Sequence, residues 1–184
     1  MRKAKEEKVV KTSLNSTLLF SDDKKKRFRL HIEWDKDKPV ATVIMLSPSN
    51  TTGIFFDKTT NNVLSNLSRL DYGSVYIVNL FAELQENVRF SDKDDLENLQ
   101  IISNVVDIAD KVIFAVGTGH QSNKAVQKRQ KSVVEILVKS FQKCYCIADE
   151  YGQMFYHPLC PKVATWNLVE LPFKQLCKEL GIKC

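Results

Sequence analysis

The stretch VIMLSPSN, residues 43–50, predicts a buried strand that ends directly in a polar loop. The apolar run 41–46 is typical of a central strand with both faces covered. The loop combines one proline with five hydroxyl or amide side chains: Ser47, Pro48, Ser49, Asn50, Thr51 and Thr52. These residues either position a ligand on a stiffened loop, or they cap the next helix and build turns.

The same pattern recurs along the chain. Asn79 ends the apolar run 75–78, the motif GTGH at 117–120 follows the run 112–116, and HPL at 157–159 follows a further strand. Ligands of open α/β sheets bind outside the carboxyl ends of the strands, where such loops meet. The sequence therefore predicts a binding site at that edge of a sheet.

Hydrophobic periodicity predicts alternating strands and helices. The predicted strands are 28–34, 41–46, 75–78, 112–116 and 144–148, and the predicted helices are near 63–70, 91–109, 122–140 and 172–181. The first two strands are expected to pair antiparallel across the turn at 35–39. Right-handed crossovers then give a three-layer α/β sandwich with a mostly parallel central sheet and one antiparallel edge strand.

The length of 184 residues and the 43% hydrophobic content fit one core. We expect an N-terminal arm at 1–26, apolar enough for partial docking, and a single α/β domain at 27–184. The net charge of +5 permits a polyanionic partner without requiring one. Basic clusters at 24–27 and 124–131 either contact phosphates or are solvated faces.

Residues 1–11 are charged, and no apolar stretch fits a signal peptide or a membrane span, so a cytoplasmic location without a membrane partner is expected. The oligomeric state is not predicted. Five cysteines, an odd number, argue against a disulfide framework. Cys144 and Cys146 either bind a metal with Cys160 or are small buried hydrophobes.

No cofactor is expected. The cysteines lack the spacing of a zinc site, so no metal is predicted. The chain also lacks the GxGxxG fingerprint and a Walker A loop, which argues against NAD and ATP enzymes of those types.

Three polar residues carry both a structural and a functional interpretation. Asp57 either caps the helix that follows it or acts as a base. Asn79 must find hydrogen-bond partners in a ligand or in a neighbouring loop, because an unpaired buried amide is costly. His157 precedes a proline and so lies extended at a strand exit, where its imidazole either serves as acid, base or donor, or is structural.

Residues 27–161 resemble the bacterial and phage family known as domain of unknown function 1643. The motifs are RFRL at 27–30 before Trp34, IMLSPS at 44–49, DKT at 57–59, YG at 72–73, VNLF at 78–81, Gly117, and Gly152 leading to HPL at 157–159. This resemblance implies no established activity.

A more distant similarity is to the uracil-DNA glycosylase superfamily, through Ser47-Pro48-Ser49, Asn79 and His157-Pro158. It implies a glycosylase-like fold, with water activation at the first motif, base-edge reading by Asn79 and leaving-base stabilisation by His157. The chain departs from that family at Ser47, because the glycosylases carry Asp or Asn before this proline. Serine does not replace an ionised carboxylate as a base.

The leading hypothesis is a protein that binds a nucleotide or a nucleic-acid base, and whether it also acts as a glycosylase-like hydrolase is left open. The alternatives are a noncatalytic sensor of such a ligand, and an interaction scaffold whose loops do not converge. Phe55, Phe56 and Phe81 either wall a base pocket or belong to the core. The candidate catalytic residues are His157, Asp57 and Asn50, and the candidate substrate-binding residues are Ser47, Pro48, Ser49, Thr59, Asn79, Phe81, Gly117 and His120.

Overall fold

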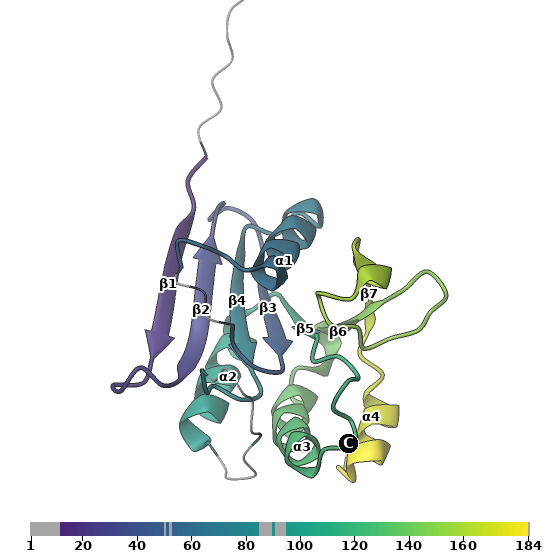
Figure 1. Ribbon diagram of the computed structural model, residues 1–184. Helices are drawn as coiled ribbons and strands as arrows, with labels where there is room; N and C mark the ends of the chain where they lie inside the picture. The colour runs from purple at the N-terminus through teal and green to yellow at the C-terminus, as the bar shows by residue number, and fades with distance from the viewer. Residues whose placement is uncertain (1–11, 50, 52, 85–89, 91–94, 184) are drawn as a thin grey trace, which may run out of the picture.

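A seven-stranded sheet crosses the molecule in the order β1-β2-β4-β3-β5-β6-β7, with four α-helices packed against it (Figure 1). The computed structural model describes residues 12–49, 51, 53–84, 90 and 95–183. The strands are β1 (Asn15–Phe20), β2 (Arg27–Glu33), β3 (Val40–Met45), β4 (Ser74–Asn79), β5 (Lys111–Phe114), β6 (Cys144–Ala148) and β7 (Asn167–Glu170). The helices are α1 (Lys58–Arg69), α2 (Leu96–Ile108), α3 (Lys124–Val138) and α4 (Phe173–Leu180), with short 3-10 turns at Phe141–Lys143 and Pro161–Val163.

The expected α/β class is confirmed, but the expectation of a mostly parallel sheet is not supported. Parallel pairing is confined to β4, β3, β5 and β6. Among the described strands, the pairs β1–β2, β2–β4 and β6–β7 are antiparallel, so neither edge of the sheet is parallel. A parallel pairing needs a long crossover, usually an α-helix, and the described connections from β1 to β2 and from β6 to β7 contain no α-helix.

The predicted pairing of the strands at 28–34 and 41–46 is wrong, because β4 lies between them. Leu30 of β2 is opposite Ile77 of β4, while Val43 of β3 pairs with Ile77 from the other side. β3 is therefore hydrogen-bonded on both edges, by β4 and β5. This central position explains its unbroken apolar run, since every residue from Ala41 to Met45 is buried.

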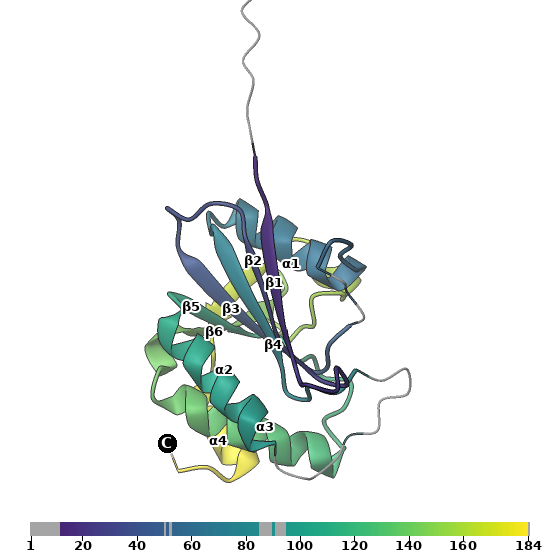
Figure 2. The same ribbon diagram turned by 90° about the vertical axis from the view of Figure 1, so that its left-hand side faces the viewer.

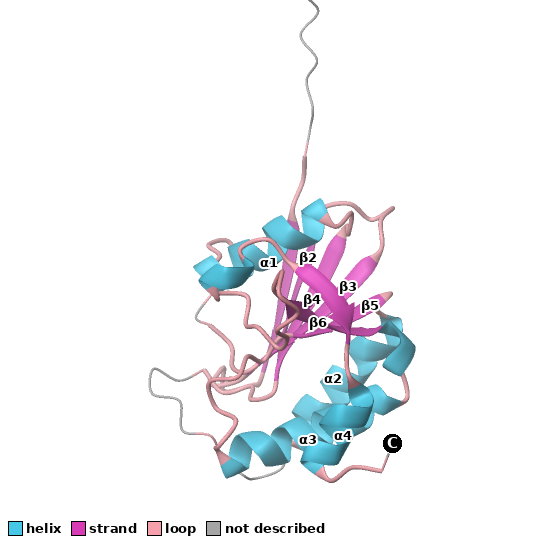
Figure 3. Ribbon diagram, turned by 90° about the vertical axis from the view of Figure 1, so that its right-hand side faces the viewer, coloured by secondary structure: helices cyan, strands magenta, loops and turns pink. Residues whose placement is uncertain are grey.

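The helices divide between the two faces of the sheet. Figures 2 and 3, which view the molecule from opposite sides, both show α1 over one face and α2, α3 and α4 over the other. Each face has its own apolar cluster, and alternation along β4 sends Ile77 into the α1 cluster and Val78 into the other.

Two strands were not predicted as such. Residues 15–20, within the expected arm, form the edge strand β1, in which Leu18 packs on the α1 side while Leu19 is 37% exposed. β7 is only four residues long and contains no fully buried residue. α2 is capped by Asp95, whose carboxylate accepts from the Asn98 backbone, and the predicted opening at Ser91 and Asp94 lies outside the described residues.

Within the described ranges, none of the helices combines the length and apolar content needed to span a bilayer.

Candidate functional site

A pocket of about 410 Å³ lies at the carboxyl ends of the parallel strands. Its walls come from the loops after β3, β5 and β6, which include Ser47, Gly117, Thr118, His120, Phe155 and His157. Four of the predicted site residues therefore meet in one place, although their positions span 111 residues of sequence. The parallel strands bring them together, because strands that run in one direction end at one edge.

Gly117 allows the loop after β6 to approach the end of β5. Its φ is +80°, in the left-handed region that favours glycine. A Cβ built at this position would lie 3.0 Å from the Cβ of His157, and the next nearest atoms belong to the His157 backbone. The glycine thus leaves room for the histidine next to the end of β5.

His157 lines the pocket, and one of its ring nitrogens is engaged in its own turn. Its Nδ1 accepts a hydrogen bond from the Leu159 backbone N–H at 3.2 Å, which places the proton of the neutral ring on Nε2. Burial lowers the pKa of His157, and the negative charge of Asp57 opposes this only in part. At neutral pH the imidazole is therefore an uncharged Nε2–H donor.

α1 holds the segment that carries His157. Its side chains Asn62 and Asn66 stand one helical turn apart and face this segment. Asn62 Nδ2 donates to the Pro158 carbonyl at 3.1 Å, and Asn66 Nδ2 donates to the Ala164 carbonyl at 3.1 Å. The backbone N–H of Trp166 donates to Asn66 Oδ1 at 2.8 Å. These bonds satisfy backbone groups of the irregular segment near the site, which has no neighbouring strand to pair with.

A second polar cluster joins the loop after β3 to the start of α1. Asp57 caps α1 and accepts from the Thr60 backbone N–H at 2.6 Å, which confirms the capping interpretation. Burial alone would raise the pKa of Asp57, but hydrogen bonds from Ser49 and Thr60 and the charge of Arg27 outweigh it. The pKa of Asp57 is lowered as a result, so this carboxylate is ionised at neutral pH.

Arg27 is the cation of this cluster and was not among the predicted site residues. It is 1% exposed, its Nη1 donates to the Ser49 carbonyl at 3.0 Å, and burial lowers its pKa to about 10. Its Nε has no hydrogen-bond partner among the described residues. β2 runs antiparallel to β4, so the first residue of β2 stands at the edge where β4 ends. The sequence did carry one indication of this role, because Arg27 is a charged residue at the start of an otherwise apolar strand.

Asn79 ends β4 as predicted, and its side chain is isolated. It is 1% exposed, and neither Oδ1 nor Nδ2 has a hydrogen-bond partner among the described residues. Its backbone carbonyl accepts from Asn98 Nδ2 at 3.0 Å. By alternation with Ile77 the side chain lies on the α1 face. Asn79 does not line the pocket described above.

The remaining candidates are spread around the site. Phe81 is 3% exposed and packs between the Phe90 ring and the Arg129 guanidinium, in the core rather than in the pocket. Phe55 is 79% exposed. Thr59 is half-buried in the first turn of α1, and Pro48 is half-buried in the loop. The candidate Asn50 lies outside the described residues.

Phe155 and Tyr156 also line the pocket, and they were not among the residues predicted from the sequence. Phe155 has a φ of +66°, an uncommon backbone conformation for a non-glycine residue. Tyr156 Oη donates to the Asp149 carboxylate at 2.8 Å, which fixes the ring. Their only signal in the sequence was their position directly before His157.

The cysteines do not form one ligand set. Cys144 and Cys146 belong to the cluster under α2 and α3, while Cys160 packs against the α1 cluster on the opposite face. Burial raises the pKa of the Cys144 thiol to about 12, so it stays protonated. In the described part of the chain, no group of three or more His, Cys, Asp or Glu side chains is arranged to hold a metal ion.

Comparison with known proteins identifies a family and no further relative. No curated protein and no solved structure matches the chain, so the similarity to uracil-DNA glycosylases stays a prediction. A family model does match, and it covers the strands and loops that build the pocket, from the start of β2 to the turn after His157. The chain belongs to the family described as protein of unknown function (DUF1643), whose model matches residues 27–159.

Proposed function

We propose that the pocket at the carboxyl edge of the sheet binds a nucleobase, either free or within a nucleotide or nucleic acid. One observation carries the proposal: a neutral imidazole donor, hydroxyl groups and aromatic rings face the same cavity of about 410 Å³. Small-molecule sites have this size and combine apolar walls with a few fixed polar groups. A nucleobase has flat faces for the rings and a polar edge for the donors.

Different polar groups of the pocket would bind different atoms of the base. The Nε2–H of His157 would donate to a carbonyl of the base, and Ser47 and Thr118 supply hydroxyls that both donate and accept. Asn79 does not line the pocket but still supports the proposal. Burying its two unpaired amide atoms costs free energy, and a ligand that bonds to them would remove this cost. An amide presents a donor and an acceptor side by side, which matches the edge of a base.

Asp57 favours hydrolysis of an N-glycosidic bond as a second candidate function. Its ionised carboxylate acts electrostatically on His157 and on Arg27. A carboxylate that already accepts from Ser49 and Thr60 retains lone pairs for a water molecule. In such a reaction the water oxygen attacks the sugar carbon and gives a proton to the Asp57 carboxylate, while the bond to the base breaks and its electron pair goes to the base. The Nε2–H of His157 hydrogen-bonds to the departing base, which then takes up the proton from Asp57. We place recognition without cleavage, an alternative in the sequence analysis, ahead of hydrolysis, because Ser47 supplies no base at the first motif.

The proposal keeps the cytoplasm as the location. Among the described cysteines, Cys144, Cys146 and Cys160 are free thiols, as expected in a reducing compartment, whereas Cys177 is disulfide-bonded.

The test is a mass-spectrometric screen of binding and turnover against nucleosides, nucleotides and oligonucleotides with normal, damaged and modified bases. Wild type is compared with His157→Gln and Asn79→Leu. His31→Gln is the matched control, because His31 is a half-buried histidine that stacks on Tyr76 within the sheet and does not line the pocket.

Binding that is lost in His157→Gln and kept in His31→Gln, with no product, supports a recognition site. Release of a free base that depends on His157 supports the hydrolase. If no nucleobase compound binds to the wild-type protein, the proposed function is wrong.

A further inference from the structure

Arg27 joins three segments of the chain near the carboxyl edge of the parallel strands. Its backbone N–H donates to the Ala82 carbonyl at 2.8 Å, which ties the start of β2 to the segment after β4. Its side chain reaches the loop after β3, where Nη1 donates to the Ser49 carbonyl at 3.0 Å. Because strand pairing and the bond to Ala82 fix its backbone, Arg27 gives this loop a fixed point of attachment.

The loop after β3 depends on this attachment. For residues 47–49, the bond from Arg27 to Ser49 is the one bond to a backbone group that the described part of the chain supplies. Ser47 lines the pocket, and Pro48 restricts rotation between Ser47 and Ser49. A contact that holds Ser49 therefore also holds Ser47 in the pocket wall.

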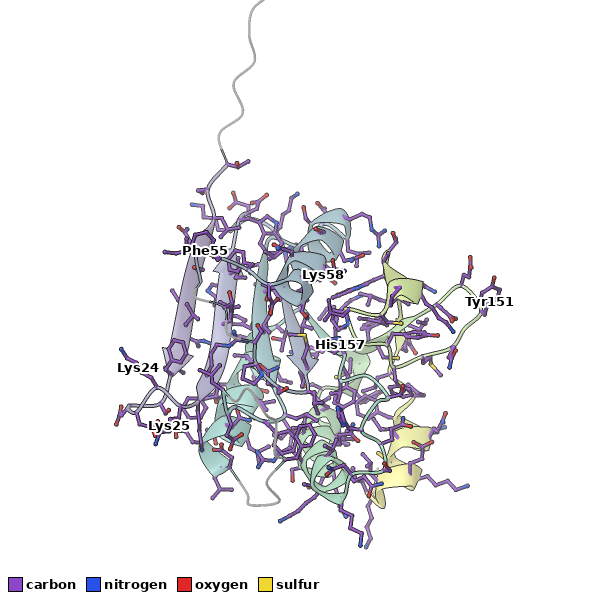
Figure 4. The ribbon with its side chains drawn as sticks, viewed as in Figure 1. Lys24, Lys25, Phe55, Lys58, Tyr151 and His157 are labelled. Atoms are coloured by element: carbon purple, nitrogen blue, oxygen red, sulfur yellow. The ribbon has the colours of Figure 1, made fainter. Side chains whose placement is uncertain are left out.

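Ser49 extends the attachment to the start of α1. Burial raises the pKa of Asp57, and the hydrogen bond from the Ser49 side chain is the largest of the causes that lower it, with the charge of Arg27 acting in the same direction. Asp57 in turn acts electrostatically on His157. In Figure 4 the labelled Lys58, which directly follows Asp57, and the labelled His157 both lie near the centre of the view. The contacts thus lead from Arg27 through Asp57 to His157.

The guanidinium of Arg27 is kept at a cost to stability. It is 1% exposed, it has no ion pair with a described residue, and its Nε has no described hydrogen-bond partner. Arginine is almost never fully buried unless it is paired. An apolar side chain of similar length would fill the same space without this desolvation cost. Residues that lower stability in this way are expected where function needs them.

We propose that Arg27 is the positioning residue of the pocket: through Ser49 it holds the loop after β3 against the start of α1, with Ser47 in the pocket wall. Arg27 does not line the pocket itself, so it acts through these residues and not on the ligand. The inference rests on the proposed function and deepens it, because it names the residue on which the binding arrangement of the same site depends.

The experiment compares wild type with Arg27→Met, Arg27→Lys, Ser49→Ala and the double variant R27M/S49A. Arg29→Met is the matched control, because Arg29 is a half-buried arginine of the same strand that lies over the Tyr76 ring and does not line the pocket.

Three quantities are measured for each protein. NMR of the ligand-free protein gives the pH midpoint of the Asp57 carboxyl titration. Urea denaturation gives the free energy of unfolding. Calorimetry gives the dissociation constant for each of the four common ribonucleoside 5′-monophosphates.

In Arg27→Met we expect Asp57 to titrate at a higher pH than in wild type and nucleotide affinity to fall at least about tenfold. The free energy of unfolding should not decrease, because the variant no longer buries a charge. Arg27→Lys keeps the charge and a donor and should recover part of the affinity. In R27M/S49A the shift of the Asp57 midpoint should be smaller than the sum of the two single shifts, since Arg27 acts through Ser49. Arg29→Met should leave the Asp57 midpoint and the affinity unchanged.

A lower stability of Arg27→Met with an unchanged Asp57 midpoint and unchanged affinity would make Arg27 a structural residue and overturn the inference. Additive shifts in the double variant would also overturn it, because Arg27 would then not act through Ser49. If Arg27→Met does not fold, Ser49→Ala decides in its place, and an unchanged Asp57 midpoint in that variant contradicts the inference.

The inference and the proposed function can fail separately. If the monophosphates bind equally tightly to wild type and to Arg27→Met, the nucleobase site stands and the role of Arg27 is wrong. If none of them binds to the wild type, the proposed function fails this test, while the Asp57 titration of the ligand-free protein still decides whether Arg27 positions the loop.

Discussion

The amide of Asn79 is buried at the end of β4 with no described partner for either polar atom. Leucine has a similar shape and no polar atoms. Asn79→Leu should therefore raise the free energy of unfolding of the ligand-free protein, by about 1–3 kcal/mol, or about 2–4 °C in Tm for each kcal/mol. Because Asn79 does not line the pocket, nucleobase binding by the same variant tests whether its amide reaches the ligand.

Thermal unfolding with and without ligand measures both effects. Ser103→Ala is a suitable control, because Ser103 is half-buried on α2 and away from the site. A variant that is less stable and still binds would mean that Asn79 is a structural residue.

His157 makes stability depend on pH. Burial lowers its pKa below the ordinary value of 6.5, so the unfolded chain binds more protons than the folded one as the pH falls through 6.5. The free energy of unfolding should decrease from that pH down to the folded pKa, and then level off. His31 acts in the same direction, because burial also lowers its pKa. Urea denaturation at pH 7.5 and 5.5 should show the loss in the wild type.

The double variant H31Q/H157Q should flatten this dependence, since glutamine does not titrate in the range. His120→Gln is the control, because His120 is exposed. An unchanged slope in the double variant would assign the effect to other groups. Protonation at Nδ1 also breaks the bond from the Leu159 N–H, so ligand affinity should fall in the same pH range.

At the scale of elements, α1 stabilises the site through its amides. Asn66 bonds to both Ala164 and Trp166, and removal of its side chain leaves a buried donor and an acceptor unpaired. Asn66→Ala should cost about 2–4 kcal/mol, and ligand affinity should fall because the segment carrying His157 loosens. Ser65→Ala, at an exposed position of the same helix, is the control. Urea denaturation compares the free energies of unfolding of Asn66→Ala and Ser65→Ala. Equal values would show that α1 does not stabilise the segment that carries His157.

Most elements could be predicted because their signals are local. β6 begins and ends where its alternation predicted, at Cys144 and Ala148, and α4 lies between Pro172 and Gly181, whose φ is +63°. β7 was missed because its four residues carry no buried apolar pattern. Pairing depends on distant parts of the chain, which is why β4 was not expected between β2 and β3.

The same limit applies to the site. Ser47, Gly117, His120 and His157 were expected at one edge, because that inference needs only parallel strand ends. The place of Arg27 depends on the antiparallel pairing of β2 with β4, a long-range contact that no local pattern reports.

At the scale of the whole molecule, β1 makes the start of the described chain part of the sheet. Leu18 packs with the α1-side cluster while Leu19 points outward, so the two residues form a matched pair. Leu18→Asp should cost about 1–3 kcal/mol, because it removes buried apolar surface, and Leu19→Asp should change stability by less than about 0.5 kcal/mol. Guanidinium denaturation compares the free energies of unfolding of the two variants. Equal decreases would show that β1 does not bury alternate side chains against the α1-side cluster.

The bonds from Asn66 to Trp166 also give the protein an optical reporter. Trp166 is 3% exposed, its indole Nε1 has no described partner, and its backbone belongs to the segment that α1 holds behind His157. The emission of a buried indole shifts when its surroundings become more polar or less rigid. The chain has two tryptophans, and Trp34→Phe leaves Trp166 as the sole emitter. Fluorescence titration of that variant would follow occupation of the neighbouring pocket without any added label.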